Sequence, residues 1–220
     1  MGSNLLYRIL SIVLSVPAVV FAFTVKGFGQ AFVSDKLGDP TPRNNGRLSL
    51  NPMDHIDLFG FIFILLFGFG WCKPVPTSSR FYKHFKRDKA LVSISGPLFL
   101  ILGGFVMSFF AALFTLIYKS SGSEILSYVV MIFEYASLIP VSLAFFYLLP
   151  LPGLDGYNFI TTFTPVSWNG FLYKVEKYSL LIFIGFILLL DYTNIGFLIQ
   201  LPAAALSSLF SGLWALIFRI

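Results

Sequence analysis

The sequence predicts an all-α polytopic membrane protein with about five transmembrane helices plus a re-entrant segment. Of its 220 residues, 57% are apolar and 11% are charged, whereas about a quarter of the residues of a soluble globular protein are charged. The positive mean hydropathy of +0.84 also indicates a membrane protein. Because apolar runs recur along most of the chain, we expect a single integral membrane domain over residues 1–220.

The expected helices follow from the apolar runs, since about 20 residues cross the hydrocarbon of a bilayer. Runs of nearly that length lie at residues 5–25, 90–118, 125–149, 172–193 and 195–218. The first run has some features of a signal peptide, because Arg8 precedes apolar residues that end in small side chains. It continues to Lys26 without a charged break, so we expect a retained transmembrane helix.

A shorter apolar run at 58–71 contains three glycines and is too short to cross the membrane. Such a run is typical of a re-entrant segment, which returns to the side from which it came. Both flanks would then be cytoplasmic. The basic loop 73–89 agrees with this, because it carries six of the fifteen Lys and Arg residues. Anionic lipid headgroups explain this loop better than nucleic acid or a docked protein does.

This topology brings two distant residues to the same face of the membrane. The first helix reaches the cytoplasmic side near Lys26. The helix at 125–149 returns to that side and leads directly into the turn at 149–156, which contains Asp155. We therefore expect Lys26 and Asp155 to lie at similar depth.

Several segments resemble the short bacterial site-2 proteases, which are intramembrane zinc metalloproteases of family M50. They are 37–41, 46–57 (with Asn51, Pro52 and His55), 68–76, 87–92, the pair Gly96 and Pro97, and 149–156. The resemblance implies a site-2-protease-like core over about residues 20–160, followed by C-terminal transmembrane helices over 172–220. It also implies a multi-pass protein of the bacterial cytoplasmic (inner) membrane.

A zinc peptidase helix carries His, Glu and His at its first, second and fifth positions, because side chains i and i+4 share a helix face. The resemblance places Lys26, Gly27 and Gln30 at these positions and Asp155 at the third zinc ligand. One ligand of three is retained and the catalytic base is absent. The pattern predicts a degenerate site with no catalytic residues, no bound metal and no other cofactor.

Two further positions depart from the family pattern. The family commonly has an asparagine three residues after the Gly-Pro pair and another before the Asp-containing turn, and here Leu100 and Tyr147 stand there. A merely divergent enzyme would more often retain its base. The shared scaffold with these losses therefore favours a pseudoprotease.

Lys26 needs an explanation, because an ionisable side chain within a transmembrane helix is costly unless it is paired, solvated or extended to the interface. One interpretation is that its ammonium replaces the zinc ion and forms a salt bridge with Asp155. Gln30, one turn along, could donate to the same carboxylate. The alternative is that Lys26 extends to the cytoplasmic headgroups.

The first functional interpretation is a catalytically inactive protein that acts as a scaffold, assembly subunit or regulator. Its expected partners are transmembrane helices of other membrane proteins and the lipid bilayer, with no nucleic acid. A second is an active intramembrane zinc metalloprotease with an unorthodox site. The ligands of that site would be His55, His84, Cys72 and Asp155. A third is a transporter or channel subunit that uses Glu134, an intramembrane charge, together with Lys26.

Overall fold

The computed structural model describes residues 2–67, 70–192 and 196–219, and all regular elements in these residues are helical. Some predicted features fall outside them: Gly68 and Phe69 of the 68–76 segment, and the predicted helix ends at residues 193 and 195.

Four helices of the described part are long and apolar enough to cross a membrane. They lie in α1 (Gly2–Lys36), α4 (Phe85–Ser121), α5 (Glu124–Tyr147) and α9 (Phe197–Phe218). The expected all-helical, multi-pass architecture is therefore confirmed. The shorter elements are α2 (Thr41–Asn44), α3 (Leu58–Phe67), α6 (Asp155–Phe163), α7 (Asn169–Lys177), α8 (Ser179–Tyr192) and single 3-10 turns at Pro52–Asp54, Ser79–Phe81 and Val166–Trp168.

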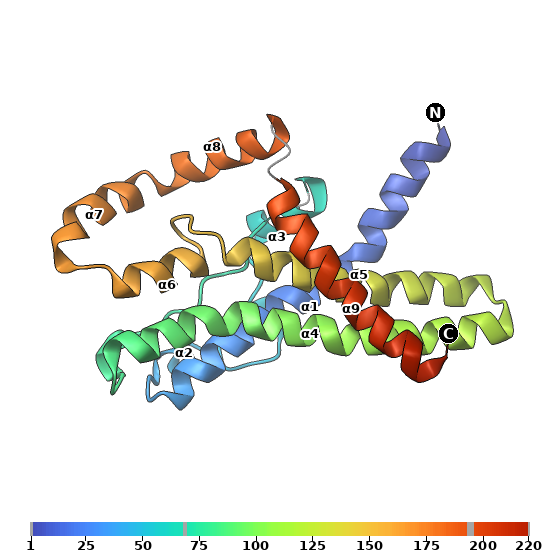
Figure 1. Ribbon diagram of the computed structural model, residues 1–220, viewed down its shortest axis with the longest axis horizontal. Helices are drawn as coiled ribbons and strands as arrows, with labels where there is room; N and C mark the ends of the chain where they lie inside the picture. The colour runs from blue at the N-terminus through green and yellow to red at the C-terminus, as the bar shows by residue number, and fades with distance from the viewer. Residues whose placement is uncertain (1, 68–69, 193–195, 220) are drawn as a thin grey trace.

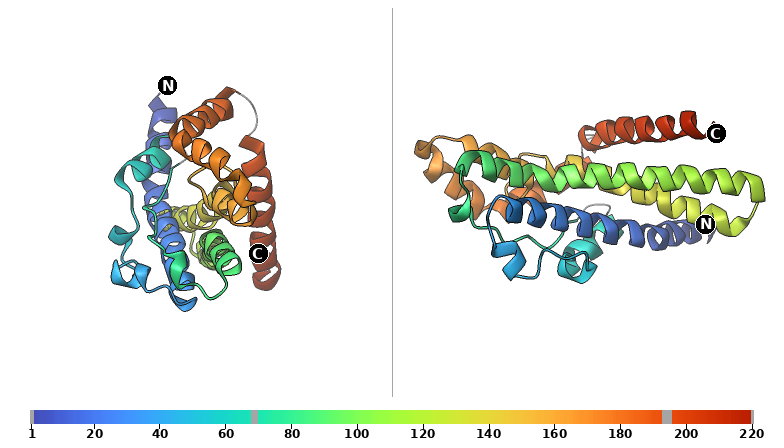
Figure 2. Two further views of the ribbon diagram at one scale, coloured as in Figure 1. Left: turned by 90° about the vertical axis from the view of Figure 1, so that its left-hand side faces the viewer. Right: turned by 90° about the horizontal axis from the view of Figure 1, so that it is seen from below.

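The helices α4 and α5 form a long antiparallel pair (Figure 1). Helices α1 and α9 lie on opposite sides of this pair (Figure 2, right). The approach of α4 to α5 is close at Gly104, where a Cβ would overlap the side chain of Val141 and the carbonyl of Ser137. Small residues permit such close packing in lipid, where the hydrophobic effect does not drive helices together. The buried core of the bundle includes Val19, Phe23, Leu100, Leu143, Ala144 and Phe146.

The apolar run at 58–71 forms the ten-residue helix α3, followed by a chain that turns back along it. Ten residues rise only about 15 Å, half the thickness of the hydrocarbon. The two flanks meet, because the amide of Lys73 donates to the carbonyl of His55 at 2.9 Å. A Cβ on Gly60 would overlap the backbone of Trp71, so the returning chain lies directly against α3. This is the shape that a re-entrant segment requires, and its insertion from the cytoplasmic side remains a prediction.

Arg47 clamps these two flanks together. It is only 4% exposed, although it carries a charge. Its guanidinium donates to the carbonyls of Asp54, Lys73 (2.6 Å) and Pro74 (3.0 Å). The segments before and after α3 are thus fixed to one another by a single side chain.

The change Arg47→Met keeps an unbranched apolar stem but leaves these carbonyls without their donor. A hydrogen bond to a charged group contributes about 1.5–3 kcal/mol, and water can partly replace the donor at the exposed residues Lys73 and Pro74, so we expect the free energy of unfolding to fall by about 2–4 kcal/mol. Unfolding of the purified protein in detergent, followed by circular dichroism, measures this. Arg80→Met, at an exposed position of the same loop region, is the matched control. Equal stability of the two variants would refute the clamp.

Two predicted helices differ from the structure. The first extends from Gly2 to Lys36 rather than ending near residue 25, because Pro17 does not interrupt it and no further proline follows before Pro40. Lys26 therefore lies well inside α1. The expected spanning helix at 172–193 is wrong for the residues described, since the chain breaks at Tyr178 between α7 and α8.

The cause of that break lies in the sequence. Lys174, Glu176 and Lys177 make the first part of the run polar, and within the 14-residue helix α8 only residues 180–190, before Asp191, are continuously apolar. A helix of 14 residues is about 21 Å long, shorter than the hydrocarbon of about 30 Å. Helix α8 contacts the bundle through Phe183, whose ring lies 5.9 Å from that of Trp71 and 6.2 Å from that of Phe146.

Candidate functional site

The residues predicted to form a degenerate zinc site, Lys26, Gln30 and Asp155, come together where α1, the end of α5 and the start of α6 meet. Helix α1 carries Lys26 and Gln30 one turn apart, and these side chains therefore share a face. Helix α5 ends at Tyr147, and a turn rich in proline then leads to Asp155, the first residue of α6. In this turn Gly153 has a φ of 93°, which favours glycine. The fold thus brings together residues separated by more than a hundred positions.

Lys26 and Asp155 form a buried ion pair. The Nζ of Lys26 lies 2.8 Å from Oδ2 of Asp155, and the two side chains are 5% and 7% exposed. The Nε2 of Gln30 donates to Oδ1 of the same carboxylate at 3.4 Å. The structure thus places Lys26 against Asp155 rather than extended toward headgroups. Removing either charge alone would leave the other buried and unpaired, the costly outcome for such a pair.

Tyr147 lies beneath the ammonium of this pair. The Nζ of Lys26 is 4.0 Å from the centre of the Tyr147 ring, within the range of a cation–π interaction. The hydroxyl of Tyr147 accepts from the amide of Cys72 at 2.9 Å and lies 3.5 Å from Sγ of the same residue. Tyr147 therefore joins the ion pair to the chain that returns from α3. Sequence reasoning noted Tyr147 only as a replaced asparagine, because nothing local indicates which ring faces a given lysine.

A histidine from elsewhere in the chain fills the space beside Gly27, the position predicted to correspond to the catalytic Glu. A Cβ built on Gly27 would overlap the ring of His55. His55 is fully buried, and its Nε2 lies 2.7 Å from the carbonyl of Ser49. Burial lowers the pKa of His55, which favours a neutral ring. Gly27 thus supplies no base, and any larger side chain there requires the His55 ring to move.

The remaining family residues support this arrangement. Asn51 caps the 3-10 turn that begins at Pro52, since its Oδ1 accepts from the amide of Met53 at 3.2 Å, and this turn leads into His55. Gly96 of α4 faces the ion pair, because a Cβ there would lie 3.2 Å from Cγ of Lys26. Pro97 is buried within α4 next to it. The Gly-Pro pair therefore allows α4 to pass close to the site.

In the described part of the chain, neither His84 nor Glu134 forms a hydrogen bond or an ion pair with Lys26 or Asp155. His84 precedes α4, and Glu134 lies in the middle of α5. Among the described residues, no group of three His, Cys, Asp or Glu side chains is placed to hold a metal ion. An ammonium, a carboxamide and one carboxylate do not fit zinc, which takes imidazole, thiolate and carboxylate ligands. The side chains of Lys26, Gln30 and Asp155 therefore form an ion pair with an added hydrogen bond, and this donor set does not fit zinc.

Comparison with known proteins places the chain in a family. No family model matches the sequence, and no solved structure does. A curated protein of Bacillus subtilis (strain 168), the "Putative zinc metalloprotease YwhC", is 34% identical over 170 residues, which cover 76% of this chain and 76% of that protein. This similarity agrees with the motifs found in the sequence. The chain therefore belongs to the site-2-protease-like family of membrane proteins that includes YwhC.

Proposed function

We propose that this chain is a catalytically inactive member of its family that binds transmembrane segments of other proteins without cleaving them. It would act as a scaffold, an assembly subunit or a regulator in the bacterial cytoplasmic membrane, with its basic loop 73–89 on the cytoplasmic side. The observation that supports the proposal most directly is the ion pair between Lys26 and Asp155. Asp155, which the resemblance aligns with the third zinc ligand of the family, is already paired with an ammonium of the same chain.

The chemistry of hydrolysis explains why this substitution matters. In a zinc peptidase the metal polarises the scissile carbonyl and lowers the pKa of a bound water, and a nearby carboxylate takes the proton. Lys26 is committed to Asp155 and to the face of Tyr147. Gly27 has no side chain to act as the base. These residues therefore offer neither a ligand set for the Lewis acid nor the proton acceptor of that mechanism.

Binding of transmembrane segments does not need the metal. Association of helices in lipid depends on close packing of small residues and on polar contacts between helices, and both survive the loss of zinc. A member of the family that keeps the scaffold and loses the metal would retain recognition and lose cleavage. Such a protein could hold a membrane partner in place, or withhold it from an active protease.

The decisive experiment compares the zinc content of the purified wild-type protein with that of a Lys26→His/Gln30→His variant. This variant restores two imidazoles beside Asp155 and leaves Gly27 unchanged, so the His55 ring stays in place. We expect no zinc in the wild type and about one zinc per chain in the variant, since three protein ligands suffice for a zinc site. Adding Asp155→Asn to the variant should remove the metal again. Stoichiometric zinc in the wild type would overturn the proposal.

A further inference from the structure

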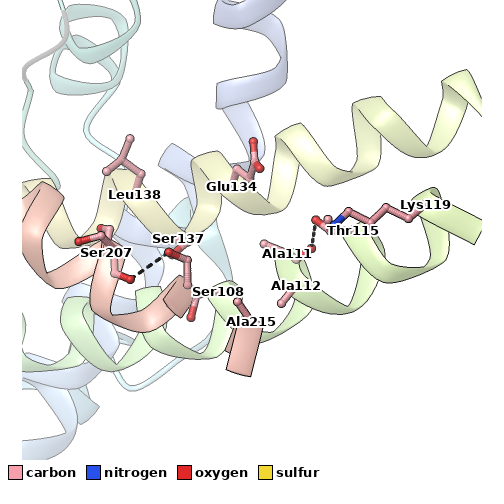
Figure 3. A pocket seen from close by; sticks show the side chains of 12 residues that line it. Ser108, Ala111, Ala112, Thr115, Lys119, Glu134, Ser137, Leu138, Ser207 and Ala215 are labelled. Atoms are coloured by element: carbon pink, nitrogen blue, oxygen red, sulfur yellow. Dashed lines mark hydrogen bonds between the residues drawn. The ribbon is translucent and has the colours of Figure 1, made fainter. Parts of the chain in front are cut away.

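A second polar feature of the membrane-spanning region lies between α4, α5 and α9, away from the ion pair. Between these helices lies a cavity of about 500 Å³ that is open on one side. Nine of its twelve lining residues are Ser, Thr or Ala. Ser108, Ser137 and Ser207, one from each helix, gather at one end of it, whereas Lys119 lies at the other end (Figure 3). We call this space the serine cavity.

The serine cavity is a groove between two walls of small side chains. On α4 the lining residues Ser108, Ala111 and Thr115 recur every three or four positions, and on α9 Ser207 and Ser211 do the same. Each set therefore forms one stripe along its helix. Stripes of small residues are the surfaces on which transmembrane helices approach one another closely.

The wall formed by α9 is held in place by an aromatic anchor. The Nε1 of Trp214 donates to Oγ of Ser108 at 2.9 Å, and its ring lies 5.2 Å from Phe105 and 5.1 Å from Phe109. Trp214 therefore fixes α9 on α4 beside the groove.

The charge at the cavity indicates what that occupant carries. Glu134 lines the cavity and is the eleventh residue of the 24-residue helix α5, so in a helix that spans the bilayer it would lie near the membrane centre. No described residue forms an ion pair or hydrogen bond with its exposed side chain, Lys119 of the opposite wall included. In the same cavity the buried Oγ of Ser207 has no hydrogen-bond partner in the described part. An acidic side chain at this depth is costly unless it is paired.

We propose that the serine cavity receives a transmembrane helix of a partner protein that bears a lysine or arginine near its midpoint, with Glu134 as the counter-ion. The inference rests on the proposed function, because it specifies where a transmembrane segment binds and which charged residue that segment carries. The basic side chain of such a helix is as costly in lipid as Glu134, so pairing relieves both charges. A lipid acyl chain could fill the space, but it has no positive charge to pair with the Glu134 carboxylate and no group to hydrogen-bond with the hydroxyl of Ser207.

The test uses the full-length protein in phosphatidylcholine vesicles with synthetic transmembrane peptides of about 21 residues. The peptides are identical Leu-Ala helices whose central residue is Lys, Leu or Glu, and energy transfer to the labelled protein reports association. We expect the Lys peptide to bind about tenfold more tightly than the Leu peptide, since polar contacts between membrane helices contribute about 1–2 kcal/mol in model peptides. The Glu peptide should bind least.

Two variants locate this preference. Glu134→Gln should abolish the preference for Lys without unfolding the protein, because Glu134 has no described partner to lose. Glu124→Gln, at the exposed first turn of the same helix, is the matched control and should leave the preference unchanged. Ser211→Leu places a large side chain in the groove and should weaken the binding of all three peptides.

The outcomes separate this inference from the proposed function. Equal binding of the Lys and Leu peptides to the wild type, or a preference for Lys that survives Glu134→Gln, overturns the role of Glu134. If peptides bind equally and Ser211→Leu has no effect, the inference fails while binding of transmembrane segments elsewhere stands. If no peptide binds, both fail. If dodecylamine binds to the cavity while the three peptides bind equally, the ligand of the cavity is a small amine. That result would overturn the proposal that the ligand is a transmembrane helix.

Discussion

Replacing Lys26 by methionine is expected to lower the free energy of unfolding by about 3–5 kcal/mol, the usual cost of removing one partner of a buried ion pair. Methionine keeps an unbranched side chain of similar length, so the loss reports the charge rather than a cavity. Asp155 would remain buried, with only the Gln30 amide at 3.4 Å to compensate it. Unfolding in mixed detergent and SDS, followed by circular dichroism, measures the difference.

The partner substitution shows whether the pair itself is the cause. In the double variant Lys26→Met/Asp155→Leu neither charge is buried, and most of the lost stability should return. The pair of Arg43 and Asp35 is the control, because its charges lie 2.6 Å apart but the Arg43 side chain is 65% exposed. Arg43→Met should change the stability little, as exposed pairs contribute little. A double variant no more stable than Lys26→Met would disprove the coupling.

Gly156→Ala is expected to destabilise the protein by about 3 kcal/mol, at the upper end of the cost of overpacking. A Cβ at this position would overlap the backbone carbonyls of Leu148 and Leu149. Backbone atoms cannot rotate away as a flexible side chain can, so the start of α6 must shift. Asp155 is the adjacent residue, and the shift should also draw its carboxylate away from Lys26.

The control for this change is Gly170→Ala in α7, where a Cβ would meet no atom within 4 Å. Alanine has the higher helix propensity, so this variant should be unchanged or slightly more stable. Thermal unfolding of both variants in one detergent provides the comparison. If the two substitutions had the same effect, the packing beneath the Asp155 turn would be looser than the structure indicates.

Run lengths and charges predicted much of the fold, because they need only local sequence. The same reasoning placed Lys26 and Asp155 at one face of the membrane. It failed at 172–193, although the cluster of Lys174, Glu176 and Lys177 was a visible signal that the run was too short. Apolar residues stand on both sides of this polar cluster, and average hydropathy therefore predicts one continuous helix where the structure has two.

The details of the site depend on tertiary packing and could not be predicted. The ring of His55 fills the space beside Gly27, and Tyr147 faces Lys26, only because α1, the loop before α3 and the end of α5 meet in one arrangement. The serine cavity is a similar case. The small-residue stripe of α4 can be recognised in the sequence, whereas its position opposite the stripe of α9 follows from the anchor at Trp214.

The ion pair also has a consequence for how the protein matures in the cell. A metalloprotein acquires its ion after synthesis, and its stability then follows the concentration of free metal by mass action. Here the positive charge next to Asp155 is the Lys26 ammonium of the same polypeptide, so every chain carries its own counter-charge. Charge compensation is complete as soon as the first and sixth helices meet. Biogenesis of this protein should therefore proceed equally well in zinc-starved and zinc-replete cells, and chelators added during growth should leave its abundance in the membrane unchanged.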